Sequence, residues 1–317
     1  MTIVLQPIIP LKTFRFYFKT ESTIRLPSYP GSAWRGALGH ALKKTVCVVR
    51  NQPCQHCLLK NACAYSIVFE TPPPSHTEKM RKYTAAPHPF VIKFLPDVDN
   101  SSTDYQFDVI LLGHGQRYLP YLVHAFKTAG LMGIGGHRQV FTLQSVDDID
   151  QYGVASVLYE NDALNVQKPA DSIQLPALPE KIKLRFDSPL RLTQDSKNIS
   201  AADFNFAVFF STLLRRQSLL SYFHTDTPLE TDFASLTSQA KTIDFKNKHL
   251  EWFDWTRYSS RQAAEINMGG LVGTVELNMR GLNVFWPYLW LGQWTHVGKG
   301  TSMGMGAYTI ESLDASA

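Results

Sequence analysis

Apolar and polar side chains alternate near the start of the chain, where Phe14, Phe16 and Phe18 are separated by Arg15 and a tyrosine and followed by Lys19. A period of two is typical of a strand that buries one face and leaves the other face polar. The pattern therefore predicts a first strand in this region.

The pattern then changes to a helical period. Ser32 is a plausible N-cap, and apolar residues recur at helical spacing at Trp34, Ala37, Leu38, Ala41 and Leu42. Further along, the patterns predict strands over 90–95 and 105–112, a helix over 118–129 and a strand over 140–146. The order βαββαβ is that of the ferredoxin-like unit, which RNA-recognition domains also use.

A second set of elements follows residues 165–180, a segment with three prolines and little periodicity that we interpret as a linker. Beyond it the patterns predict a strand near Ile182, a long helix over 203–223, and strands over 249–255 and 272–279. We expect an N-terminal domain over 1–164 and a C-terminal domain over 181–317.

The tail of the chain repeats part of the first half at an offset of 167 residues. The tripeptide Pro-Tyr-Leu at 120–122 recurs at 287–289, and residues 141–146 match 308–313 at the same offset. We therefore expect an α+β protein with tandem ferredoxin-like (RRM-like) domains, each ending in a helix, a Gly-rich turn and a strand. Coincidental similarity between two short amphipathic segments is the alternative.

Composition places the chain among globular proteins. Its 317 residues are 44% hydrophobic, which is enough for more than one packed core. No window approaches the roughly 18 consecutive apolar residues that indicate a membrane span, and the first residues lack the order of a signal peptide. We expect a soluble cytoplasmic protein that does not enter the membrane.

Charge changes this picture, because the net charge of +4 is unevenly distributed along the chain. Residues 1–95 carry 13 Lys and Arg but only 3 acids, a net of +10, whereas the remaining residues carry a net of −6. A basic region of this kind indicates a polyanionic partner such as nucleic acid. A well-solvated basic surface is the alternative.

All four cysteines fall within residues 47–63, at Cys47, Cys54, Cys57 and Cys63. Disulfides are disfavoured in the cytosol, whereas four thiolates that include a C-x2-C pair suit a closed tetrahedral zinc site. We therefore predict a structural zinc in a four-cysteine insertion of the first domain. Reduced cysteines packed in a loop are the alternative, and His56 could replace one ligand.

A Gly-rich turn over 298–306 precedes the last predicted strand. It places Lys299 among Gly298, Gly300, Gly304 and Gly306. The spacing fits neither a dinucleotide fingerprint nor a P-loop. Glycines would let a phosphate backbone approach main-chain N–H groups, with Lys299 adding charge, so we predict RNA contact here. A tight turn that needs positive φ would explain one or two of these glycines more readily than four.

Several segments together resemble one family. They are Trp34-Arg-Gly-Ala-Leu-Gly39, Ala64-Tyr-Ser-Ile-Val-Phe-Glu70, Arg257-Tyr-Ser-Ser-Arg-Gln262, Gly269-Gly-Leu-Val-Gly273, the cysteines and the Gly-rich turn. The chain resembles the CRISPR-associated precursor-RNA processing endoribonucleases of the RAMP superfamily. The resemblance implies tandem ferredoxin-like domains, binding of CRISPR repeat RNA, and metal-independent cleavage of precursor crRNA that releases guide RNAs. It also implies variable catalytic groups, often a histidine near the first helix aided by Tyr or Lys, and some inactive members.

Metal-free RNA cleavage needs one group to deprotonate the 2′-hydroxyl, one to protonate the leaving 5′-oxygen, and a cation for the developing charge. His40 is the leading candidate, because it lies on the polar side of the first helix, one turn after Gly36 and beside Lys43. Tyr29 precedes the helix and could position the 2′-hydroxyl. The alternative for His40 is a solvent-facing histidine on a basic helix.

The arginines and the other basic residues supply candidate RNA contacts, because a guanidinium group pairs with phosphate and stacks on bases. We predict contacts from Arg35, Lys44, Arg257 and Arg261, with ordinary surface salt bridges as the alternative. Four further histidines in predicted loops are weaker candidates, expected at the surface or in contact with RNA: His76, His88, His137 and His296.

Three functions compete for this sequence. The first is a metal-independent endoribonuclease that forms a 2′,3′-cyclic phosphate. The second is a catalytically inactive RNA-binding subunit, with other subunits of a CRISPR effector complex as its partners. The third is a zinc-dependent DNA-binding protein, which is disfavoured because no helix-turn-helix or finger spacing is present.

Overall fold

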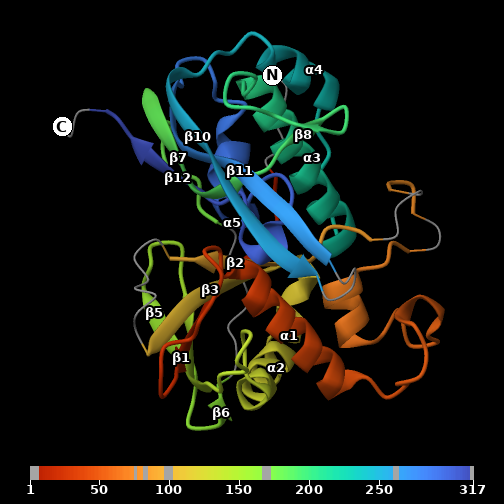
Figure 1. The fold of residues 1–317 in the computed structure, drawn as a ribbon. Helices are drawn as coiled ribbons and strands as arrows, with labels where there is room; N and C mark the ends of the chain where they lie inside the picture. Colours follow the sequence, from red (N-terminus) through yellow and green to blue (C-terminus); the bar gives the residue numbers. More distant parts are fainter. Residues whose placement is uncertain are drawn as a thin grey trace. The chain divides into compact units, whose positions relative to one another are not determined.

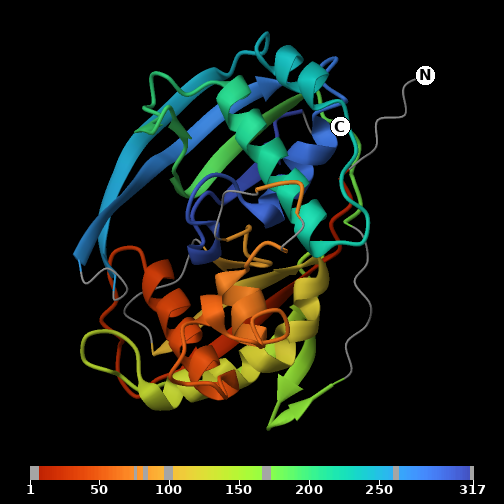
Figure 2. The ribbon, with the colours of Figure 1, turned by 90° about the vertical axis from the view of Figure 1, so that its right-hand side faces the viewer.

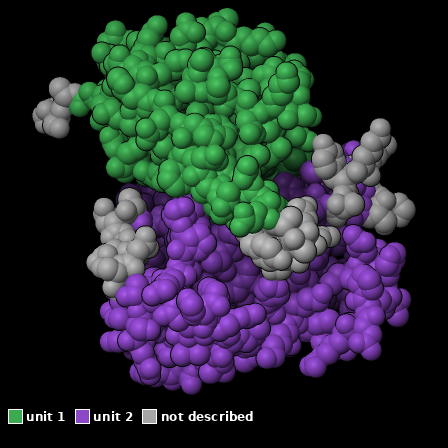
Figure 3. All heavy atoms as spheres, viewed as in Figure 1, with its two compact units in different colours: residues 1–8, 173–222, 227–317 green, residues 9–172, 223–226 purple. Residues whose placement is uncertain are grey.

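The computed structural model describes residues 7–74, 77–80, 85–95, 103–165, 173–259 and 264–314. The chain divides into two compact units, coloured separately in Figure 3. The N-terminal unit comprises residues 9–172 and 223–226. The C-terminal unit comprises residues 1–8, 173–222 and 227–317.

The N-terminal unit contains one antiparallel sheet and two helices. Its elements are β1 (Leu11–Lys19), α1 (Gly31–Val46), β2 (Phe90–Phe94), β3 (Asp104–Leu112), α2 (Leu119–Met132), β4 (Thr142–Ile149), β5 (Ala155–Glu160) and β6 (Ala163–Leu164). The strand order is β2-β3-β1-β4-β5-β6. Helices α1 and α2 lie side by side along the sheet (Figure 1).

The core of this unit lies between the helices and the sheet, and it follows the alternation of β1. Phe16 and Phe18 are at most 1% exposed. The ring of Phe18 lies 5.0 Å from that of Trp34 on α1, and the ring of Phe16 lies 5.0 Å from that of Phe126 on α2. Burial of each such ring contributes about 1.5–3 kcal/mol, so β1 fixes both helices to one face.

The C-terminal unit repeats this layout. Its elements are β7 (Lys181–Leu190), the short strands β8 (Thr193–Gln194) and β9 (Lys197–Asn198), α3 (Phe206–His224), α4 (Phe233–Ala240), β10 (Lys246–Ser259), β11 (Ala264–Asn278), α5 (Trp286–Thr295) and β12 (Tyr308–Ser312). The main sheet runs β10-β11-β7-β12, and all its pairs are antiparallel. Figure 2 shows α3 crossing one face of this sheet.

The two units share a topology. When the principal strands are numbered within each unit, both sheets run in the order 2-3-1-4. Strand 1 is followed by α1 in the N-terminal unit and by α3 and α4 in the C-terminal unit, and one helix precedes strand 4 in each. Helix α5 begins at residue 286 and α2 at residue 119, a difference of 167, and both carry Pro in the first turn. The expected α+β class is confirmed, and the strand pairs of both main sheets are antiparallel.

Local details differ from the sequence prediction. Ser32 is not the N-cap of α1, because the Pro30 carbonyl accepts hydrogen bonds from the N–H groups of Ala33 and Trp34 and Pro30 caps the helix. Strands β5 and β6 extend the first sheet and were not predicted. Residues 166–172 of the expected linker lie outside the described residues, and 173–180 belong to the C-terminal unit. Within the described ranges, no helix has the length and apolarity to cross a membrane.

Candidate functional site

Helix α1 has one polar edge. His40, Lys43 and Lys44 are exposed, whereas Leu38 on the opposite side is completely buried. A Cβ atom added at Gly36, one turn before His40, would meet nothing within 4 Å. The structure therefore places an imidazole and two ammonium groups on one open edge, where a polyanion can approach them.

Arg35, beside this edge, is held by aromatic and polar contacts. Its guanidinium carbon lies 4.4 Å from the centroid of the Phe69 ring, and its Nη2 atom lies 3.2 Å from His88 Nε2. A guanidinium group only donates hydrogen bonds, so His88 Nε2 accepts. His88 Nδ1 then carries the proton and donates it to Thr71 Oγ1 at 2.8 Å. His88 therefore orients Arg35 as a neutral imidazole. Its position in a Pro-containing segment of the sequence did not indicate this role.

The segment 64–71 packs directly on α1. A Cβ atom at Gly39 would lie 2.5 Å from the Phe69 ring, so glycine is required there for close approach. Lys43 Nζ lies 5.5 Å from the centroid of the Tyr65 ring. Burial, reinforced by Glu70, raises the pKa of the Tyr65 hydroxyl well above its ordinary value. The segments 34–39 and 64–70, which carry part of the family resemblance, are therefore one packed assembly.

Tyr29 differs from the exposed edge of α1. It is only 7% exposed, and its ring lies edge-on to that of Phe94 with 6.2 Å between centroids. The sequence pattern could not show this burial, because it depends on which strand covers the loop before α1. Its role in positioning a 2′-hydroxyl stays a prediction.

All four glycines of the turn 298–306 have positive φ: Gly298 +85°, Gly300 +77°, Gly304 +91° and Gly306 +71°. This is the left-handed region that favours glycine, so backbone conformation alone accounts for all four. The turn is also largely buried from residue 301 onward, whereas Lys299 is exposed.

The N–H groups of this turn are largely used within the C-terminal unit. Gly304 N donates to Thr301 O at 2.9 Å, and Gly306 N donates to Pro189 O at 3.0 Å. Ser188 Oγ donates to Gly304 O at 2.7 Å. Gly304 and Gly306 therefore shape the turn, and the exposed Lys299 is the group through which RNA contact stays a prediction.

The hairpin of β10 and β11 carries the other predicted contacts. Arg257 on β10 is half-buried, and its Nε atom has no hydrogen-bond partner in the part of the chain that the structure describes. Arg261 lies outside the described residues. Sequence reasoning missed Trp252 and Phe253, which are 40% and 36% exposed on the same strand. Their apolar character indicated a strand but not the exposure of both rings.

The remaining loop histidines are not alike. His137 is exposed after α2, whereas His76 lies outside the described residues. His296 is completely buried, with Nδ1 3.2 Å from Met305 O. The expectation that His296 lies at the surface or contacts RNA is therefore wrong, because the residue after α5 turns into the core with the Gly-rich segment.

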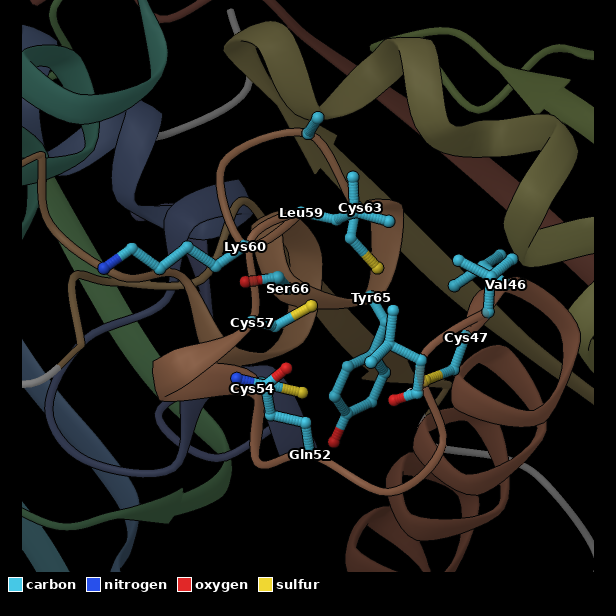
Figure 4. Close-up of a pocket in the computed structure, with 13 residues that line it drawn as sticks. Val46, Cys47, Gln52, Cys54, Cys57, Leu59, Lys60, Cys63, Tyr65 and Ser66 are labelled. Atoms are coloured by element: carbon cyan, nitrogen blue, oxygen red, sulfur yellow. Dashed lines mark hydrogen bonds between the residues drawn. The ribbon is translucent and has the colours of Figure 1, made fainter.

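The four cysteines line one pocket at the end of α1, as Figure 4 shows. All four are free and partly buried. Burial raises the pKa of the Cys54 thiol, an effect that nearby Lys43 opposes. Among the described residues, no group of three or more His, Cys, Asp or Glu side chains lies close enough together to hold a metal ion in this arrangement. His56 is exposed and does not line this pocket.

Two family models match the chain. A model described as the AF_1859_N N-terminal domain matches residues 9–171, just over half of the chain, and the model of the CRISPR-associated endoribonuclease Cas6 matches residues 184–308. An Archaeoglobus fulgidus protein described as uncharacterized is 22% identical over 151 residues. That match covers 46% of this chain and 50% of the relative, so the matched part spans half the relative's length.

Solved structures show the same fold. A Cas6 (TTHB231) product complex matches with a TM-score of 0.57 and 16% identity, covering 95% of this chain and 99% of the other. Thermus thermophilus Cas6 (TTHB231) matches with a TM-score of 0.54 and 14% identity, covering 96% and 99%. The two family models agree with the residues that carried the resemblance: over residues 9–171 the chain belongs to the family of the AF_1859_N N-terminal domain, and its residues 184–308 match the CRISPR-associated endoribonuclease Cas6.

Proposed function

We propose that this protein is an endoribonuclease that binds CRISPR repeat RNA and cleaves precursor crRNA within the repeats, without a catalytic metal. The observation that carries the proposal is the exposed edge of α1. There His40 lies one turn after the open surface at Gly36 and one turn before Lys43 and Lys44. The match of residues 184–308 to the Cas6 endoribonuclease model supports the substrate class. We also propose that the two βαββαβ units are the tandem ferredoxin-like domains of this family.

The proposed reaction uses the substrate's own nucleophile. The 2′-hydroxyl loses its proton and its oxygen attacks the adjacent phosphorus, while the bond to the 5′-oxygen breaks and that oxygen takes up a proton. The products are a 2′,3′-cyclic phosphate and a 5′-hydroxyl. In this scheme His40 transfers a proton as general acid or base, and Lys43 stabilises the negative charge that develops on phosphate.

Binding is assigned to groups around this edge and on the C-terminal unit. The guanidinium of Arg35 is oriented by Phe69 and His88, which lowers the entropy lost when it pairs with phosphate. Lys44, Lys299, Arg257 and Arg261 are the other proposed contacts. Tyr29 remains the candidate for positioning the 2′-hydroxyl.

The second candidate is a catalytically inactive RNA-binding subunit of a CRISPR effector complex. The same basic edge favours it, since Arg35 and the lysines would bind RNA whether or not His40 transfers a proton. A fold match to a partial Cas6-RT-Cas1–Cas2 complex shows that a chain of this fold occurs in a larger assembly, although this chain spans 48% of that one.

Cleavage in the presence of EDTA separates the two candidates. The full chain is incubated with a radiolabelled repeat RNA, and both binding and product length are followed. The endoribonuclease predicts a single specific cut that proceeds at the same rate with and without EDTA. Tight binding with intact RNA would favour the inactive subunit, and cleavage that requires added metal would contradict the proposed chemistry.

A further inference from the structure

Residues 47–63 have no core of their own. None of these 17 residues is buried, and Val48 and Leu58 are 77% and 97% exposed. The regular structure within the segment is one 3₁₀ turn, Cys54–His56. A segment of this size that buries no apolar side chain needs another source of stability, for which small protein modules commonly use a disulfide or a metal.

The cysteines are the groups that this segment turns inward. Figure 4 shows all four sulfur atoms directed to the same pocket, although they come from three separate parts of the segment. Cys47 N donates to Lys43 O at 2.9 Å at the end of α1, and Cys57 N donates to Cys54 O at 3.2 Å in the turn. Cys63 N donates to Leu59 O at 2.8 Å. Three of the cysteines are therefore held by local backbone hydrogen bonds, and the Cys47 thiol lies 3.4 Å from Val49 O.

The lining of the pocket combines the four cysteines with one basic residue, Lys60. No Asp or Glu is among the described residues that line it. A site made of soft sulfur ligands without carboxylates suits zinc rather than magnesium or calcium.

We propose that Cys47, Cys54, Cys57 and Cys63 bind one zinc ion in a closed tetrahedral site that orders residues 47–63. Binding exchanges the four thiol protons for one Zn²⁺, and the pocket contracts until each sulfur lies about 2.3 Å from the ion. His56 is excluded as a ligand because it does not line the pocket. With four protein ligands the ion has no open position for water, so its role is structural and separate from RNA cleavage.

The test measures zinc in the purified full chain, beside Cys57→Ser and the control Gln52→Ala. Gln52 lines the same pocket but supplies no thiol. The site predicts about one zinc per chain in the wild type and in Gln52→Ala, and a large loss of zinc in Cys57→Ser. Limited proteolysis should cut within 47–63 in Cys57→Ser and in the chelated wild type, but not in the zinc-loaded protein.

A second measurement on the wild type keeps the test decisive if Cys57→Ser does not fold. Four thiols should become reactive together as a chelator releases the zinc. Metal-free protein with four freely reactive thiols and an intact segment would overturn the proposal. So would disulfides, iron with sulfide, or zinc that Cys57→Ser retains in full.

Discussion

Arg35 and His40 lie on the same helix but are held in different ways. Arg35 rests on the Phe69 ring and His88, so its guanidinium is oriented before any ligand arrives. His40 is exposed, and no hydrogen bond to its side chain occurs among the described residues. This division suits a fixed phosphate contact on the same helix as a proton-transfer group that aligns when RNA is bound.

Replacement of His40 should separate catalysis from binding. We expect His40→Ala to slow cleavage by about two to four orders of magnitude, the usual effect of losing a general acid or base. RNA affinity should change little, because Arg35 and both lysines remain. Single-turnover cleavage and filter binding measure the two quantities.

His124→Ala is the matched control, since His124 is an exposed histidine on α2 of the same unit. It should cleave at nearly the wild-type rate. Full activity in His40→Ala would reassign proton transfer to Tyr29 or to an exposed loop histidine such as His137.

The helical period of α1 was enough to predict which of its side chains are exposed, since buried residues recur along the helix with a period of about 3.6 residues. The burial of Tyr29 and His296 and the pairing of His88 with Arg35 could not be predicted in this way. Each depends on segments distant in sequence: Phe94 beside Tyr29, and the Gly-rich turn around His296. The local pattern therefore predicted the exposed residues of α1 but not the contacts from distant segments that bury or orient other candidate residues.

Among the elements, the turn between α5 and β12 shows most clearly what the glycines do. A Cβ atom at Gly306 would lie 1.8 Å from Val297 O, in a backbone that closes the turn onto the strand β12. Gly281 has a similar φ of +76°, but nothing lies within 4 Å of its added Cβ atom. Alanine at either position would adopt an unfavourable positive φ. Only alanine at position 306 would also clash with the main chain.

Alanine at these two positions should therefore differ in cost. Gly281→Ala should destabilise the protein by about 1–2 kcal/mol, the penalty of a left-handed residue with a side chain. Gly306→Ala should cost about 1–3 kcal/mol more, because the main chain must move to relieve the clash. Urea unfolding of the full chain measures the difference, and equal midpoints for the two variants would refute this account of the turn.

At the scale of the whole molecule, the folded N-terminal unit combines basic and acidic segments that lie apart in the sequence. The N-terminal unit contains 17 Lys and Arg and 14 Asp and Glu, a net of +3, because it includes acidic strands beyond residue 95. Arg15 donates to Asp108 at 2.7 Å, and Lys12 pairs with Asp148 at 2.5 Å. Part of the basic charge is thus neutralised on the sheet, while Lys43 and Lys44 stay exposed on α1.

Salt should weaken RNA binding through the exposed cations. Suppose that Arg35, Lys44, Arg257, Arg261 and Lys299 each contact one phosphate. A plot of log K against log salt should then have a slope of about −3.5 for single-stranded RNA. Lys44→Ala should reduce the slope by about 0.7, the share of one contact. Lys127→Ala is the control, because Lys127 already pairs with Asp162 and should leave the slope unchanged. A salt-independent affinity would remove the electrostatic account.

The most direct test of the central claim is cleavage of a repeat RNA that carries a single 2′-deoxy nucleotide at the cut site, with EDTA present. If the nucleophile is the substrate's own 2′-hydroxyl, the deoxy RNA should bind with unchanged affinity and remain intact. The unmodified RNA should give an upstream fragment ending in a 2′,3′-cyclic phosphate. Cleavage of the deoxy RNA at the same position would contradict the mechanism.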